Sequence, residues 1–154
     1  MTDKLSITKD GVMITDFTQE EIAQRENERI NSQPTLSEIQ QQKILELNIA
    51  CNQDILNGFP SFCTGVEHQY NFDLEYQANM NQRATMFLLK PTMVETWWPT
   101  KDMGVITHTR EQFVQLCEDA ERTKDEKIFR YFEMKAQILA PTITTAEQVE
   151  TFVW

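Results

Sequence analysis

Signals that start and stop helices recur along this chain of 154 residues and limit the length of every element that it can form. At four predicted helix starts a threonine is followed three residues later by Glu or Gln. This is the pattern of a capping box, in which each side chain bonds the backbone N–H of the other residue. Glycine and proline supply the stops, because glycine tolerates the left-handed conformation that ends a helix and proline cannot continue one. The four motifs begin at Thr18, Thr35, Thr109 and Thr144, and the stops are Gly58, Pro91 and Pro141.

These signals predict helices of very different lengths. The first runs from residue 18 to about residue 30, the second from 35 to 57, and the third, which Asp73 can cap, from 74 to about 89. The longest runs from 109 to about 139, and a short last helix follows residue 144. The longest helix carries a predicted apolar stripe of Phe113, Leu116, Cys117, Ala120, Ile128, Phe132, Ala136 and Leu139.

Short β-prone segments lie between the predicted helices. Residues 5–8 and 12–14 flank a turn at Lys9-Asp10-Gly11, which is typical of a hairpin. Residues 66–72 alternate between apolar and polar side chains, and residues 92–98 and 105–108 form a second hairpin around Gly104. We therefore expect an α+β fold, with three or four helices packed on a small antiparallel sheet. Its strands lie near residues 66–72, 94–98 and 105–108.

The first 33 residues differ in character from the rest of the chain. They are polar and rich in charge, and their helix offers only Ile22, Ala23 and Ile30 as apolar positions. Such a narrow apolar face cannot form a core alone, because most helices are stabilised by packing an apolar face against other elements. The sequence therefore predicts an N-terminal docking arm, a hairpin plus a short helix, over residues 1–33 and an α+β domain over 34–154. Phe17 and Ile22 are candidate interface residues of this arm.

Charge and cysteine content indicate where the protein acts. Fourteen Lys and Arg against twenty-four Asp and Glu give a net charge of -10, which repels nucleic-acid phosphates and anionic lipids. We therefore expect neither nucleic-acid nor membrane partners. No apolar run approaches the ~20 residues of a membrane span, and Met1 opens a polar stretch without a signal peptide. Cys51, Cys63 and Cys117 are odd in number and lack CxxC spacing, which favours reduced thiols and synthesis in a cytoplasm.

Few residues suggest catalysis. The glycines are too far apart for a phosphate-binding loop, and no GxSxG or HExxH motif is present. Cys63 with His68, or Cys117 with His108, could form a nucleophile and its base. A metal site could use Cys63 and both histidines, but zinc usually takes four ligands at tight spacing. Buried thiols beside partly exposed imidazoles explain these residues better. We predict no enzyme, no cofactor and no metal.

Three tryptophans are candidate interface residues. Trp97 and Trp98 are adjacent in a predicted strand and should point to opposite faces, one into the core and one outward. Exposed aromatic side chains dominate protein interfaces and also form carbohydrate platforms. Trp154 ends the chain, where an apolar residue frays unless it docks, so we expect it to close the core or a subunit contact.

Two groups of short motifs, spread over residues 36–154, together form a pattern that can be compared with known families. The first group is Ala50-Cys51-Asn52, Ile55, Gly58-Phe59, Ser61, Gly65, His68, Tyr70 and Gln77-Ala78-Asn79-Met80. The second group is Gly104, His108-Thr109, Gln112, Thr144-Thr145 and Trp154. Together they resemble an uncharacterised domain common in bacteriophages and prophages, whose pattern has Asp where this chain has Tyr76. The resemblance implies a module encoded among tail genes, found in tail-fibre, tail-tip and baseplate-associated proteins. It implies no enzyme, and no catalytic residues are carried over.

This resemblance predicts a non-enzymatic structural protein of a tailed phage or prophage particle. It would sit at the tail tip, baseplate or tail-fibre attachment after synthesis in the host bacterial cytoplasm. The expected partners are other phage tail or fibre proteins, and a homo-oligomer is an open alternative. A tail-fibre assembly chaperone, absent from the mature particle, is the first rival function. An acidic inhibitor of a host nucleic-acid-binding protein ranks lower, because the negative charge is spread over every predicted helix.

Overall fold

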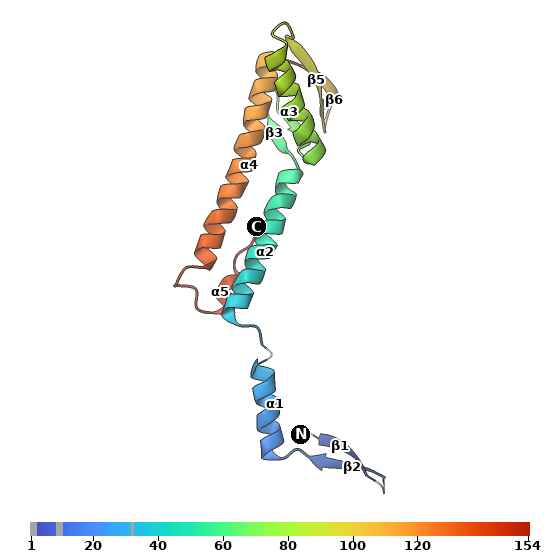
Figure 1. The fold of residues 1–154 in the computed structure, drawn as a ribbon, viewed down its shortest axis with the longest axis vertical. Helices are drawn as coiled ribbons and strands as arrows, with labels where there is room; N and C mark the ends of the chain where they lie inside the picture. The colour runs from blue at the N-terminus through green and yellow to red at the C-terminus, as the bar shows by residue number, and fades with distance from the viewer. Residues whose placement is uncertain (1–2, 9–10, 32) are drawn as a thin grey trace. The chain divides into compact units, whose positions relative to one another are not determined.

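The computed structural model describes residues 3–8, 11–31 and 33–154 (Figure 1). The chain divides into two compact units, Met1–Ile39 and Gln40–Trp154. The boundary between the units falls inside helix α2 (Leu36–Leu56). The division into an arm over 1–33 and a domain over 34–154 stays a prediction.

The first unit contains the expected hairpin and helix. Strands β1 (Asp3–Thr8) and β2 (Gly11–Asp16) pair antiparallel, and helix α1 spans Gln19–Asn31. The predicted turn at Lys9 and Asp10 lies outside the described residues. The capping box at the start of α1 is confirmed: a Glu21 carboxylate oxygen accepts from the Thr18 N–H at 3.0 Å, and the Thr18 hydroxyl accepts in return from the Glu21 N–H at 3.2 Å.

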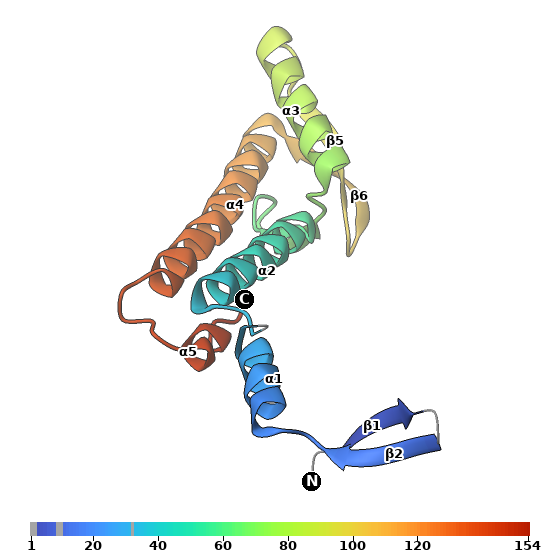
Figure 2. The ribbon, with the colours of Figure 1, turned by 60° about the horizontal axis from the view of Figure 1, so that its bottom comes forward.

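The second unit places its long helices side by side. Helices α2 and α4 lie alongside one another in both views (Figures 1 and 2). At one end of this pair α3 lies against the β5–β6 hairpin, and at the other end α5 lies near the start of α2. The remaining elements are β3 (Phe59–Ser61), β4 (His68–Tyr70), α3 (Leu74–Leu89), β5 (Glu95–Thr100), β6 (Gly104–Thr109), α4 (Arg110–Ile138) and α5 (Ala146–Glu150).

The α+β class is confirmed, but the strands do not form one sheet. In the described part of the chain each strand pairs only with its neighbour in sequence, giving the separate pairs β1–β2, β3–β4 and β5–β6. The strand predicted over 66–72 is reduced to His68–Tyr70, because its partner β3 offers only three residues for pairing. A hydrogen bond of 2.7 Å from the Lys101 N–H to the Gln69 carbonyl connects the β5–β6 pair to the β3–β4 pair. This single bond does not join the two pairs into one sheet.

Aromatic rings fill the core of the second unit. Phe59 meets Phe72 edge-on at 5.3 Å between ring centroids, and Trp98 meets Phe113 at the same separation. Such edge-to-face pairs are favourable because the positive edge of one ring contacts the negative face of the other. No helix among the described residues is long and apolar enough to cross a bilayer. The core consists of Phe59, Tyr70, Phe72, Met80, Phe87, Trp98, Phe113, Leu116 and Ala120.

The predicted apolar stripe of α4 is correct in its first half and wrong in its second. Phe132 is 56% exposed and Leu139 47%, whereas Tyr131 and Ile138 take the buried positions. The stripe departs from its predicted course because Lys127 faces inward, where its ammonium donates to a backbone carbonyl of α2 at 2.8 Å. A lysine can bury its aliphatic stem in this way and still satisfy its charge. The correctly predicted buried residues are Phe113, Leu116 and Ala120.

Candidate functional site

Two local features fix the position of α3. The Asp73 carboxylate caps the helix by accepting from the N–H groups of Glu75 and Tyr76, both at 3.0 Å. The Gln77 amide then donates to the Phe72 carbonyl at 2.8 Å, which ties the first turn of the helix to the preceding segment. These bonds set the register at which α3 faces strand β5.

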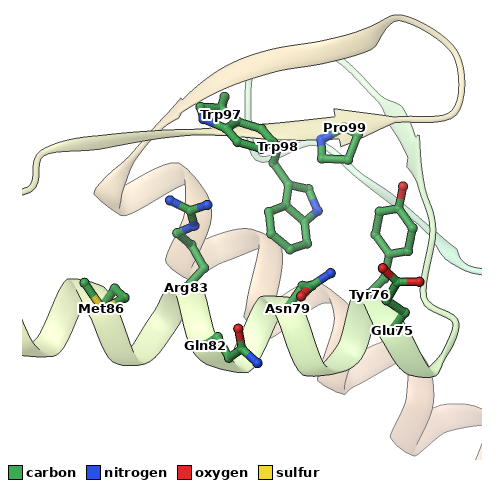
Figure 3. Close-up of a pocket in the computed structure, with 9 residues that line it drawn as sticks. All are labelled: Glu75, Tyr76, Asn79, Gln82, Arg83, Met86, Trp97, Trp98 and Pro99. Atoms are coloured by element: carbon green, nitrogen blue, oxygen red, sulfur yellow. The ribbon is translucent and has the colours of Figure 1, made fainter.

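A groove of about 450 Å³ lies between α3 and β5 (Figure 3). Trp97 and Trp98 of β5 both contribute to its lining. Their exposures differ as the predicted alternation requires, because Trp98 is 4% exposed and belongs to the core, whereas Trp97 is 60% exposed. The guanidinium of Arg83 lies 5.5 Å from the centroid of the Trp97 ring, within the range of a cation–π contact. The opposite wall carries polar residues of α3, namely Glu75, Tyr76, Asn79, Gln82 and Arg83.

One buried side-chain polar atom of this groove has no hydrogen-bond partner in the described part of the chain. The indole nitrogen of Trp98 is buried and bonds nothing there. Most buried polar groups in proteins are hydrogen-bonded, so an unpaired one in a groove calls for an explanation.

A second polar cluster lies where β3 meets α4, and its groups bind each other. The Asp119 carboxylate is 5% exposed and accepts from the Ser61 hydroxyl at 2.5 Å, the Arg122 guanidinium at 2.7 Å and the Gln115 amide at 3.0 Å. Burial opposes ionisation, but the hydrogen bonds from these three side chains outweigh it and hold the pKa of Asp119 below its usual value. This cluster is therefore complete without a ligand.

The two cysteine–histidine pairs that were considered as a nucleophile and its base, and set aside, have other partners in the structure. His68 bonds the Asp102 carboxylate at 2.8 Å instead of Cys63. The other histidine, His108, lies 2.9 Å from the Tyr70 hydroxyl, and the same hydroxyl lies 3.5 Å from the Cys63 sulfur. Cys63 and His108 thus meet through Tyr70, a link that neither predicted pair contains. It was missed because His108 on β6 is 38 residues away from Tyr70 on β4.

The electrostatics of these groups favour neutral forms. Burial lowers the pKa of His108, so its imidazole is uncharged near neutral pH. Burial also raises the pKa of Tyr70, and it raises the pKa of Cys117 to about 11, which keeps that thiol protonated. Nucleophilic cysteines need a lowered pKa, and Cys117 has the opposite. Among the described residues no three His, Cys, Asp or Glu side chains gather as metal ligands.

The remaining candidate residues occupy two different places. Trp154 closes the second unit, since its indole N–H donates to the Asp54 carboxylate at 3.1 Å and its ring lies 4.6 Å from the Arg130 guanidinium. Phe17 and Ile22 belong to the first unit. The Arg25 guanidinium lies 3.7 Å from the centroid of the Phe17 ring, and Ile22 is 39% exposed.

Comparison with known proteins identifies a family but no activity. No curated protein and no solved structure matches the chain. One family model, described as a domain of unknown function (DUF4376), matches residues 38–152. Since this match covers most of the chain, the protein belongs to the DUF4376 family.

Proposed function

We propose that this protein is a non-enzymatic structural component of a tailed phage or prophage particle, at the tail tip, baseplate or tail-fibre attachment. The observation that carries the binding part of the proposal is the groove between α3 and β5, which is lined by an exposed tryptophan and by polar side chains of α3. The phage context comes from the sequence resemblance described above. The DUF4376 match carries no function of its own.

The surface around the groove supports a role in binding. Trp97 is 60% exposed, Val105 on the neighbouring strand is 62% exposed, and Met103 in the turn between them is 67% exposed. Exposed apolar residues that gather on one element mark contact sites more often than scattered ones do. Tryptophan is also among the residues that contribute most to binding energy at interfaces. The β5–β6 hairpin is therefore the face of the second unit best suited to a partner.

The buried polar residues support the same choice over catalysis. Cys117 is held as a thiol and His108 as a neutral imidazole already engaged with Tyr70. Asp119 is used by three side chains of its own cluster. These groups stabilise the fold through their contacts with one another.

Mass spectrometry of purified particles tests the proposal. A structural component should be present in a fixed ratio to a known tail protein, and particles from a strain lacking this chain should be defective in tail or fibre attachment. Absence from mature particles, combined with a fibre-assembly defect, would instead identify an assembly chaperone. Salt-sensitive capture of a basic host protein, with particles unaffected, would favour the acidic inhibitor.

A further inference from the structure

The groove between α3 and β5 differs from an ordinary surface hollow in having a buried, unpaired donor. The indole of Trp98 is 4% exposed, and its nitrogen has no hydrogen-bond partner among the described residues. In Figure 3 this nitrogen points toward the side of the groove where Asn79 and Tyr76 lie. A buried donor is destabilising when it lacks an acceptor, so an oxygen atom of a bound molecule would satisfy it.

The other polar groups of the groove both donate and accept hydrogen bonds. Glu75 supplies a carboxylate acceptor, Arg83 supplies guanidinium donors, and the amides of Asn79 and Gln82 supply one of each. The carboxylate disfavours an anionic ligand and the guanidinium disfavours a cationic one. A neutral molecule with several hydroxyl groups, each a donor and an acceptor, matches the whole set.

The aromatic wall adds an apolar contact of the right shape. Trp97 presents its ring at 60% exposure on β5, and Trp98 forms the buried floor. The ring carbons of a sugar carry C–H groups on one face, which pack on an aromatic surface while the hydroxyls point outward to polar side chains. The groove volume of about 450 Å³ also lies within the ~300–1,000 Å³ range of small-molecule sites.

We propose that the groove between α3 and β5 is a saccharide-binding site, in which a sugar ring packs on Trp97 and its hydroxyls bond Asn79, Gln82 and the indole nitrogen of Trp98. An amphipathic peptide helix fits less well, because it needs apolar pockets for its anchor residues and α3 faces the groove mainly with polar side chains. This inference deepens the proposed function and rests on its binding part, since it names the class of ligand that the same groove would take.

The test uses the full-length chain and a defined set of sugars. Glucose, galactose, mannose, N-acetylglucosamine and N-acetylgalactosamine, with their common disaccharides, are titrated to tens of millimolar. Binding is followed by tryptophan fluorescence and by saturation-transfer NMR on the sugar protons. We expect at least one of them to bind with a millimolar dissociation constant, with its ring protons showing the strongest transfer.

Matched variants locate the binding. Trp97→Ala should abolish binding and Trp97→Phe should retain part of it, while Asn79→Ala should weaken it at least tenfold. Phe129→Ala removes an aromatic ring of similar exposure (68%) from α4, outside the groove, and should leave binding unchanged. Circular dichroism checks that each variant is folded.

Two results would overturn the saccharide site. One is the absence of any signal across the set of sugars, and the other is binding that Trp97→Ala leaves intact. Neither result alters the particle measurement above. A protein found in mature particles that binds no sugar would contradict the saccharide site alone, whereas one that binds sugar but is absent from particles would contradict the virion role alone.

Discussion

Two polar regions of the second unit are built from similar side chains but reach opposite outcomes. In the cluster around Asp119, three side chains donate to one buried carboxylate. In the groove, amide, guanidinium and carboxylate groups leave the buried indole nitrogen of Trp98 without an acceptor. The carboxylate of the cluster is hydrogen-bonded by neighbouring side chains, whereas the indole nitrogen of the groove has no partner among the described residues. Substitutions in the cluster should therefore affect folding, and substitutions in the groove should affect binding.

The largest expected effect on stability comes from Asp119→Ala. It removes hydrogen bonds to a charged acceptor and leaves the Ser61 hydroxyl, 2% exposed, without its carboxylate partner. Bonds to charged groups contribute about 1.5–3 kcal/mol each, and an unpaired buried group costs about 1–3 kcal/mol. We expect a loss of roughly 2–4 kcal/mol in the free energy of unfolding, measured by urea denaturation at pH 7. A loss below about 0.5 kcal/mol, typical of surface substitutions, would show that the cluster is not a structural unit.

The same carboxylate gives this effect a pH dependence. The folded-state pKa of Asp119 lies below its unfolded value, so its contribution is present above the unfolded value of about 3.9 and is lost as the pH falls through the folded pKa. The stability difference between wild type and Asp119→Ala should therefore shrink below about pH 4. Denaturation curves for both proteins between pH 3 and pH 7 measure it, and a constant difference would contradict the assignment.

A smaller effect on stability is expected from the buried residue His108. Burial lowers the folded-state pKa of His108, so the unfolded chain takes up a proton at a higher pH than the folded protein does. Stability should be constant above about pH 6.5 and fall as the pH drops toward the folded pKa, by at most about 1.4 kcal/mol per pH unit. His108→Gln should remove this slope. If the slope persists in His108→Gln, another group causes it.

The sequence predicted local features of the molecule well, because their signals lie within a few residues. The cap at Asp73 and the capping box that joins Thr109 to Gln112 formed as expected. The split between Trp97 and Trp98 also followed from strand alternation alone. In each case the physical cause is a backbone geometry that neighbouring residues determine.

The groove and the cluster were not predicted, because each depends on elements that are distant in sequence. Asn79 and Gln82 look like ordinary exposed helix residues until β5 is placed against α3. Their helical spacing with Glu75 and Arg83 was the available signal, yet nothing local shows which strand that face meets. Asp119 was missed for the same reason, since its partner Ser61 is 58 residues away. Lys127 faces inward toward partners about 70 residues away, since its ammonium donates to the carbonyls of Asp54 and Gly58 and lies 3.2 Å from the Asp54 carboxylate.

Thiol labelling tests the packing of Cys51 on α2 and Cys117 on α4. Cys51 is buried, and the pKa of Cys117 is raised to about 11 by burial, so both thiols should be protonated and poorly accessible. We expect both to react slowly with a thiol reagent in native buffer and fast in denaturant, followed by mass spectrometry of the labelled peptides. Fast native labelling of both would contradict the packing of α2 and α4.

The smallest expected effect on stability comes from Trp97→Ala, and it is the sharpest test of the comparison. The side chain is 60% exposed, and its main described contact is the guanidinium of Arg83 at 5.5 Å, which at an exposed site contributes about 0.5–1 kcal/mol. The free energy of unfolding should therefore fall by no more than about 1 kcal/mol. If the groove serves binding, the same variant should nevertheless be impaired in function, measured as its incorporation into particles or the activity of those particles. A loss of several kcal/mol would instead place Trp97 among the residues that hold the fold. Particles that assemble and function normally would show that the exposed face of β5 has no role there.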